Sequence, residues 1–183
     1  MITQAHLKRI LDYDPDTGVF TWRERDASLV APHRVDQWNG KHSGKVAGHL
    51  CESRNGSYYR RIFVKGKLRH AHRLAWIYVH GEDPKTVIDH INQDSTDNRI
   101  ANLRSVTREL DAKNRKQRTD NRSGVTGVHY SESEGKWHAV ININKRKTRL
   151  YRGKSFTKAV RLRRWAEKKY GYSPLHGKPR EAA

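Results

Sequence analysis

The sequence predicts a mixed α+β protein made of separate small modules, and three observations support this. Short runs with helical spacing of apolar residues alternate with short strand-like runs, and turn residues separate them. The length of 183 residues suits one ordinary domain or two to three small ones. Of the formal charge of +19, residues 112–183 contribute +15. The predicted segments are 1–56, 57–118, 119–172 and a tail at 173–183.

The N-terminal segment, residues 1–56, is predicted to hold a helix, a strand and a long loop. Over residues 2–12 the apolar side chains lie roughly on one face of a helix. The turn Asp-Pro-Asp-Thr-Gly then leads into a strand over residues 19–22. Residues 24–56 are rich in Gly, His, Ser and charge, and we expect a loop with little regular structure.

The middle segment, residues 57–118, shows strand and helix patterns in turn. Its predicted elements are a hairpin (57–64 and 68–70), a helix (72–79), a strand (86–88), a long polar loop, a strand (103–107) and a charged helix (108–118). The polar, turn-like run 119–123 follows, and we place a domain boundary there.

The segment 119–172 is predicted to form a small three-stranded antiparallel sheet with one helix. Its predicted elements are strands at 125–130, 136–143 and 148–151, and a helix at 157–170. One stripe of that helix holds Ala159, Leu162, Trp165, Ala166 and Tyr170. We therefore assign Trp165, together with Trp137 of the middle strand, to the core of this unit.

The basic excess points to a polyanionic partner. A chain with 38 Lys+Arg against 19 Asp+Glu repels itself unless an anion neutralises it, and DNA or RNA is the natural candidate. The alternative is a protein that is basic and merely soluble. No apolar run reaches membrane-spanning length, and Cys51 is the single cysteine. We therefore expect no membrane partner, no internal disulfide and a reducing cytoplasm.

The run VIDHINQDSTDNRIANLRSVTRELDAKNRK carries the candidate chemistry. Asp89 and His90 stand where a strand ends, and Asp111 follows early in the next predicted helix. A hairpin packed on that helix can bring the two carboxylates together, and a divalent cation relieves their repulsion. Oxygen ligands favour Mg²⁺ or Mn²⁺, one per active site. His90 is then placed to deprotonate a water aimed at a phosphate.

The same run, with His72-Arg73-Leu74-Ala75-Trp76, Asp97-Asn98-Arg99 and Asn102-Leu103-Arg104, resembles the HNH endonucleases of phages and mobile introns. The early DYDPDTGVFTW resembles the leader of the phage members. The resemblance implies a ββα-metal finger with Asp89 as metal ligand and His90 as general base. It also implies that Asn102 braces the loop that orients His90, and that residue 111 is the second ligand.

Three alternatives remain open for this run. Asp111 stands where the family usually has Asn or His, which leaves metal preference and rate open. An Asp-His pair can also be a turn in which Asp caps backbone amides and His is packed. His70 and His72 can chelate a metal, although packing beside the active finger is favoured.

Residues 121–172 resemble the AP2 DNA-binding domain that is appended to phage HNH nucleases. The matching runs are Ser123-Gly124-Val125-Thr126-Gly127-Val128, Gly135-Lys136-Trp137-His138-Ala139 and Lys169-Tyr170-Gly171-Tyr172, while the third strand looks one residue longer than the family pattern. Strand alternation places a polar, basic face opposite the helix. The residues expected to contact DNA are His129, Lys136, His138, Asn142, Lys147, Arg149 and Tyr151, with Arg115, Lys116 and Arg118 extending the charge.

We therefore expect a metal-dependent endonuclease that acts on double-stranded DNA as a monomer or homodimer. Hydrolysis should leave a 5′-phosphate and a 3′-hydroxyl, as the HNH resemblance implies. Two other functions stay open: a non-catalytic DNA-binding regulator derived from a nuclease, and a ribonuclease.

Overall fold

The computed structural model describes residues 2–53 and 56–178. The chain divides into two compact units, Met1–Val106 and Thr107–Ala183, and each is described by itself. Both units mix helices with antiparallel strands, in agreement with the predicted class. The predicted domain boundary at residues 118 and 119 stays a prediction. No helix in the described part of the chain is long and apolar enough to span a membrane.

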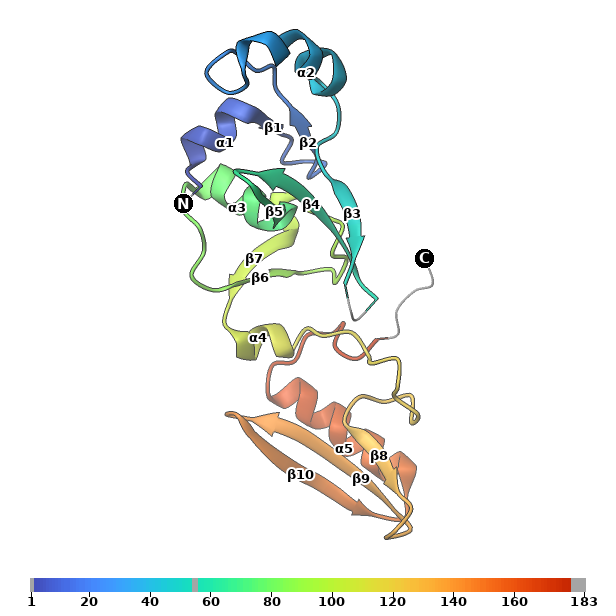
Figure 1. Ribbon diagram of the computed structural model, residues 1–183. Helices are drawn as coiled ribbons and strands as arrows, with labels where there is room; N and C mark the ends of the chain where they lie inside the picture. The colour runs from blue at the N-terminus through green and yellow to red at the C-terminus, as the bar shows by residue number, and fades with distance from the viewer. Residues whose placement is uncertain (1, 54–55, 179–183) are drawn as a thin grey trace. The chain divides into compact units, whose positions relative to one another are not determined.

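The described residues of unit 1 form three small antiparallel sheets and three α-helices (Figure 1). Its elements are α1 (Gln4–Ile10), β1 (Leu11–Tyr13), β2 (Phe20–Trp22), the 3-10 helix η1 (Pro32–Arg34), α2 (Val35–His42), β3 (His49–Glu52), β4 (Tyr58–Val64), β5 (Lys67–His70), α3 (Ala71–His80), β6 (Val87–His90), η2 (Ile100–Asn102) and β7 (Leu103–Val106). The sheets are β1–β2, β3–β4–β5 and β6–β7.

The core of unit 1 forms where α1 and α3 pack on the strands. Leu7 and Phe20 are fully buried, and Ile62 of β4 and Leu74 of α3 join the same cluster. The predicted hairpin and the helix that follows it are confirmed as β4, β5 and α3. The predicted helix over residues 2–12 is shorter, because Leu11 already pairs with Trp22 in a strand.

The prediction that residues 24–56 lack regular structure was wrong, because this segment contains η1, α2 and β3. The side chain of Asn39 accepts from the backbone of Arg25 at 2.8 Å and donates back at 2.9 Å. The guanidinium of Arg25 lies 3.8 Å from the Trp38 ring centroid and 5.1 Å from that of Trp22. The segment is thus stabilised by cation–π stacking and not by buried apolar residues. Hydrophobic periodicity does not predict a helix of this kind.

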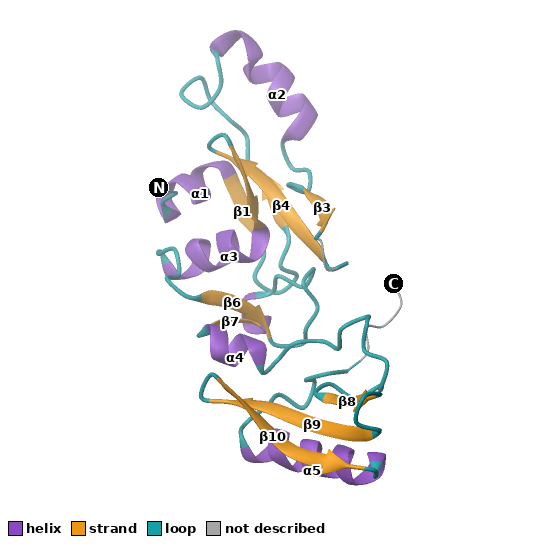
Figure 2. Cartoon of the chain, turned by 60° about the horizontal axis from the view of Figure 1, so that its bottom comes forward, coloured by secondary structure: helices purple, strands orange, loops and turns teal. Residues whose placement is uncertain are grey.

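Within residues 107–178, unit 2 forms a three-stranded antiparallel sheet in the order β10–β9–β8, with α5 packed against it (Figure 2). Its elements are α4 (Arg108–Ala112), β8 (Val128–Ser131), β9 (Lys136–Ile143), β10 (Arg146–Gly153) and α5 (Phe156–Lys169). The predicted strands and helix are therefore present, whereas the likeness to the AP2 domain stays a prediction.

The charged helix predicted at residues 108–118 ends at Ala112 in the structure. Backbone hydrogen bonds to the chain after α5 replace the missing helical ones. The amides of Ser173 and Gly177 donate to the carbonyls of Lys113 and Arg115, and the amide of Gln117 donates to Lys178. Nonlocal pairing of this kind overrides local helix propensity.

The placement of Tyr151 on the polar face was wrong. A bulge at Leu150 shifts the register, so that Arg149 pairs with Val140 but Tyr151 pairs with Ala139, on the face toward α5. An extra residue in one strand inverts the alternation beyond it. Arg152, opposite His138, takes the place on the polar face.

The assignment of Trp165 to the core was also wrong, because this side chain is 55% exposed. The buried positions of α5 are Ala159, Arg163, Ala166 and Glu167. Arg163 Nε donates to Glu167 Oε1 at 2.9 Å, and Arg163 Nη1 donates to the carbonyl of Val140 at 2.6 Å. The helix therefore buries an ion pair where a hydrophobic stripe was expected.

Candidate active site

The β6–β7 hairpin positions the two residues at the centre of the predicted site. Asp89 pairs with Arg104 and His90 with Leu103 in the antiparallel register. Both Asp89 and His90 are buried, at 9% and 6% exposure. They are the last two residues of β6, and the loop starts at the next residue, Ile91.

Asn102 braces the loop that follows His90. Its Oδ1 accepts from the backbone amide of Asn92 at 3.0 Å, and its Nδ2 donates to the carbonyl of Asp97 at 2.9 Å. The carbonyl of Asn102 also accepts from the amide of Ile91 at 2.9 Å. One buried amide side chain thus holds both ends of the loop.

The N-terminal leader supports the same loop from the other side. The hydroxyl of Tyr13 donates to the carbonyl of Asn98 at 2.7 Å in a buried position. Burial raises the pKa of Tyr13 to about 12, so this donor keeps its proton. Gly18, with φ of +73°, lies against the backbone of Asn98 where a Cβ would not fit. Residues of the leader therefore help to fix the position of the loop that follows His90.

His90 lies in a cluster of aromatic rings. The ring centroids of His72 and His90 are 5.0 Å apart at an interplanar angle of 88°, and His70 stacks on His72. Tyr59 of β4 closes the cluster, with its centroid 6.5 Å from that of His90. Burial lowers the pKa of His72 well below its usual value, so this ring is a neutral neighbour. Packing of His70 and His72 beside the site agrees with the favoured interpretation.

The electrostatic surroundings favour a neutral His90. Burial lowers its pKa, and a polar contact with Asn98 and the charge of Asp89 oppose that shift in part. A histidine that is neutral at pH 7 can accept a proton, as a general base must.

The two predicted metal ligands each carry an arginine partner. Arg104 donates from Nε and Nη2 to Asp89 Oδ2, at 2.9 and 2.7 Å. Asp111 lies on α4 of unit 2, and its Oδ2 accepts from Arg115 at 3.0 Å. Within residues 2–53 and 56–178 no group of three or more His, Cys, Asp or Glu could hold a metal ion. The predicted pair of ligands stays a prediction.

The face of the unit 2 sheet opposite α5 carries most of the residues predicted to contact DNA. The register places Asn142 beside Lys147, and His129 beside His138. Asn142, Lys147, Arg149 and His129 are exposed, and Lys136 is partly so. This face is basic and can reach a polyanion.

Some of the other residues predicted to contact DNA are instead bonded to acidic side chains of unit 2. His138 is buried, and its Nε2 lies 2.8 Å from Glu134 Oε2. Arg152 also donates to Glu134, and this bond lowers the pKa of Glu134 to about 2. Arg118 pairs with Asp120 at 2.7 Å, and Lys116 is partly buried. Their role in DNA binding, like that of Arg115 and Tyr151, stays a prediction.

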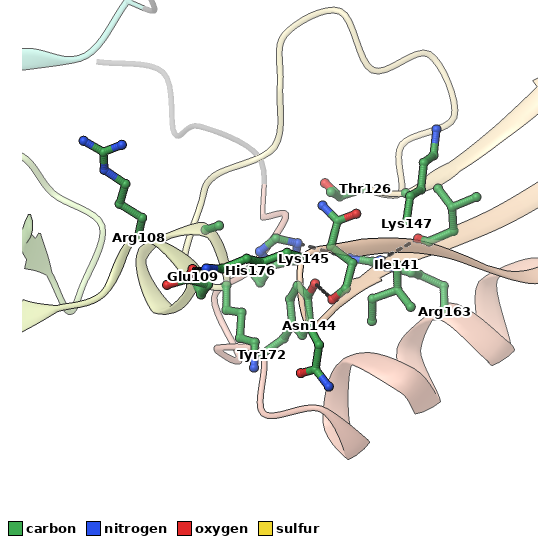
Figure 3. Close-up of a pocket in the computed structure, with 15 residues that line it drawn as sticks. Arg108, Glu109, Thr126, Ile141, Asn144, Lys145, Lys147, Arg163, Tyr172 and His176 are labelled. Atoms are coloured by element: carbon green, nitrogen blue, oxygen red, sulfur yellow. Dashed lines mark hydrogen bonds and ion pairs between the residues drawn. The ribbon is translucent and has the colours of Figure 1, made fainter.

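A cavity of about 660 Å³ lies between α4, the β9–β10 hairpin and the chain after α5 (Figure 3). Its charged lining residues are Arg108, Glu109, Lys113, Lys145, Lys147 and Arg163. Lys145 is paired with Glu109 at 3.1 Å. The cavity therefore extends the positive charge of unit 2 beyond the open sheet face.

Sequence reasoning missed three contributors to the site. Tyr59 is predicted only as part of a strand, and strand alternation does not predict that its ring packs near His70 and His90. Arg104 and Asn98 lie in runs that carried the family resemblance, but no role was assigned to them. An arginine directly opposite an acidic residue in a hairpin was the available signal for Arg104.

Comparison with known proteins locates the similarity in this part of the chain. A search of curated proteins found no match. Among solved structures, the chain resembles one titled "DNA binding and cleavage by the HNH homing endonuclease I-HmuI", with 22% identity and a TM-score of 0.36. The match covers 57% of this chain and 51% of the other, so the chain spans about half the length of that protein. The model of the HNH endonuclease family matches residues 69–113. The segment similar to HNH endonucleases thus contains all four predicted active-site residues, Asp89, His90, Asn102 and Asp111.

Proposed function

We propose that the chain is a DNA endonuclease of the HNH type, in which His90 is the general base. The single observation that carries the proposal is the state of His90. It is buried, its pKa is lowered, it follows Asp89 in a braced hairpin, and it lies inside the segment that matches the family. A merely structural histidine has no need of this combination.

The protein side of the proposed reaction is simple. His90 takes a proton from a water molecule, the water oxygen attacks phosphorus, and the bond from phosphorus to the 3′-oxygen breaks. The 3′-oxygen leaves and takes up a proton, so the products carry a 5′-phosphate and a 3′-hydroxyl. Asn102 holds the loop and thereby the direction of the His90 ring.

One divalent cation per site fits the donors present. Asp89 and Asp111 are proposed to hold it, because carboxylate oxygens suit Mg²⁺ or Mn²⁺. When bound, the cation supplies charge that stabilises the pentacovalent phosphate and the departing oxygen. Asp89 fits this role because its carboxylate is buried next to His90 and already accepts a cationic group, that of Arg104.

Unit 2 is proposed to hold double-stranded DNA by the sheet face opposite α5, as an AP2-like module would. Asn142 and Arg149 project from adjacent strands and can read base edges in the major groove. The flanking lysines then contact phosphates. The alternating register supports this arrangement.

The test is conversion of supercoiled plasmid to nicked or linear DNA, with and without Mg²⁺. The native chain is compared with His90→Ala and with His33→Ala, which removes an exposed histidine outside the site. We expect metal-dependent cutting that only His90→Ala abolishes. Equal cutting by all three proteins would refute the role of His90, and 3′-phosphate ends would refute the mechanism. A matched RNA substrate distinguishes a ribonuclease.

A second candidate function, a non-catalytic DNA-binding regulator, is favoured by one observation. Asp89 and Asp111, the proposed ligands, both pair with arginines. In an enzyme the cation competes with Arg104, so Arg104→Ala should lower the Mg²⁺ concentration that gives half-maximal cutting. Tight DNA binding without cutting by the native chain or Arg104→Ala, in any divalent metal, would favour the regulator.

A further inference from the structure

The outer face of the β4–β5 hairpin exposes an apolar pair. Phe63 is 61% exposed and Leu68 is 42% exposed, and the two residues face each other across the strands. Ile62 and Val64, which flank Phe63 on β4, point to the opposite face and are buried. Single exposed apolar residues are ordinary, but a cross-strand aromatic–aliphatic pair on a structured hairpin leaves a compact apolar ridge in water.

Positive charge surrounds this ridge. The connecting turn is Lys65-Gly66, with φ of 49° and 72°, and both Lys65 and Lys67 are exposed. Positive φ at both central residues is the tight hairpin turn that matches strand twist. Lysine is depleted from the cores of protein–protein interfaces, whereas it is typical of surfaces that meet phosphates. The charges therefore favour a nucleic acid as the occupant over a second protein.

The ridge is continuous with the candidate active site. On the same face of β4, Arg61 pairs with His70 in the next row, and Tyr59 lies one row further. Tyr59 and His70 belong to the ring cluster around His90. Four residues of strand span about 13 Å. Phe63 thus lies about 13 Å from the row of Tyr59, or about four base steps of 3.4 Å.

We propose that Phe63 and Leu68 form a wedge that enters the DNA minor groove and unstacks a base step. Apolar side chains in the minor groove partly separate adjacent bases and kink the duplex, while flanking lysines hold phosphates. The wedge rests on the proposed function, because its partner is the DNA that the site cuts. It adds a means of bending that DNA, with the unstacked step several base pairs from the broken bond.

The experiment uses the full-length chain with His90→Ala, which binds DNA without cutting it. The DNA is a fragment that contains a bond cut by the native protein and thymines at the flanking steps. Permanganate oxidises thymines that are unstacked, so it reports the kink directly. We expect reactive thymines on one side of the cut position and several steps from it, because Phe63 lies four strand residues from Tyr59, whose ring packs near His90. Phe63→Ser/Leu68→Ser in the same background should lose this reactivity.

A matched variant controls for the loss of exposed apolar surface. Val46→Ser/Leu50→Ser removes two residues of 52% and 50% exposure from the same unit, and Leu50 pairs with Arg60, away from the face of Phe63. This variant should keep the reactive thymines. In otherwise native protein, only Phe63→Ser/Leu68→Ser should slow cutting, on the order of tenfold, because the bend no longer forms.

Unreactive thymines in a complex whose native form cuts would overturn the wedge. So would equal reactivity and cutting with and without Phe63 and Leu68. Conversion of a dimer to a monomer by Phe63→Ser/Leu68→Ser, seen by light scattering, would assign the ridge to a second copy instead. Reactive thymines that depend on Phe63, in a protein that cuts no DNA, would support the wedge and refute the proposed nuclease.

Discussion

Gly18→Ala tests whether the leader positions the catalytic loop. Gly18 has φ of +73°, and a Cβ there would lie 2.5 Å from the carbonyl carbon of Asn98. Carbon atoms pack favourably at about 3.5–4.0 Å, so the loop must move by about 1 Å. The positive φ itself costs about 1–2 kcal/mol for alanine. Asn98 contacts His90, so the displacement reaches the proposed general base.

A misplacement of about 1 Å can lower a catalysed rate by about a hundredfold, which corresponds to about 2.7 kcal/mol. We therefore expect Gly18→Ala to lower kcat for plasmid nicking by about that factor, with little change in KM because the variant leaves the proposed DNA contacts of unit 2 unchanged. Gly44→Ala is the matched control. Gly44 has φ of +71°, but nothing lies within 4 Å of its added Cβ. Equal kcat values for the two variants, at equal fractions folded by urea unfolding, would refute the proposed coupling of leader and loop.

Three further predictions concern His90 and unit 2. Burial lowers the pKa of His90, and a general base must be neutral. The cutting rate at subsaturating DNA should therefore rise with pH through a midpoint below 6.5 and then stay level, whereas a midpoint at alkaline pH would identify another base. Arg163→Met should destabilise unit 2 by at most about 3–5 kcal/mol, measured by hydrogen exchange at α5 amides, because Glu167 stays buried and keeps only the half-exposed Arg164 as its cation. Arg163→Met/Glu167→Leu should recover part of that loss. Burial, and then the charge of Arg163, lowers the pKa of His176 to about 4, so the unfolded chain binds more protons between this value and 6.5. The stability of unit 2 should therefore fall by at most about 3 kcal/mol from pH 7 to pH 4, and His176→Gln, unlike His33→Gln, should remove this dependence.

Periodicity predicted the elements of the fold where apolar burial determines them. The hairpin before α3, α3 itself and α5 follow patterns of alternation or helical spacing that the structure keeps within a residue or two. The middle strand of unit 2, residues 136–143, is found as predicted. The hairpin, α3 and the middle strand bury one apolar face, which is the signal that a sequence shows most directly. The buried face of α5 also holds Arg163 and Glu167, so its bounds were predicted but its packing was not.

Elements stabilised by polar or nonlocal contacts escaped this reasoning. α2 depends on the stacking of Arg25 on Trp38 and on the side chain of Asn39, neither of which has a period. The early end of α4 depends on backbone bonds to residues more than fifty positions later, including Ser173. The longer third strand was noticed, but only the register shows that the bulge turns Tyr151 inward.

The candidate site illustrates the same division between local and nonlocal information. Spacing within the motif identified Asp89, His90 and Asn102, and Asn102 makes the loop contacts expected of it. Spacing did not reveal that Asp89 is buried against Arg104. A buried carboxylate needs a cation or several hydrogen-bond donors, and Arg104 supplies both to Asp89. In the proposed enzyme, Arg104 is the cation that a metal bound to Asp89 would displace, so the metal affinity would depend on the register of the hairpin as well as on the ligands.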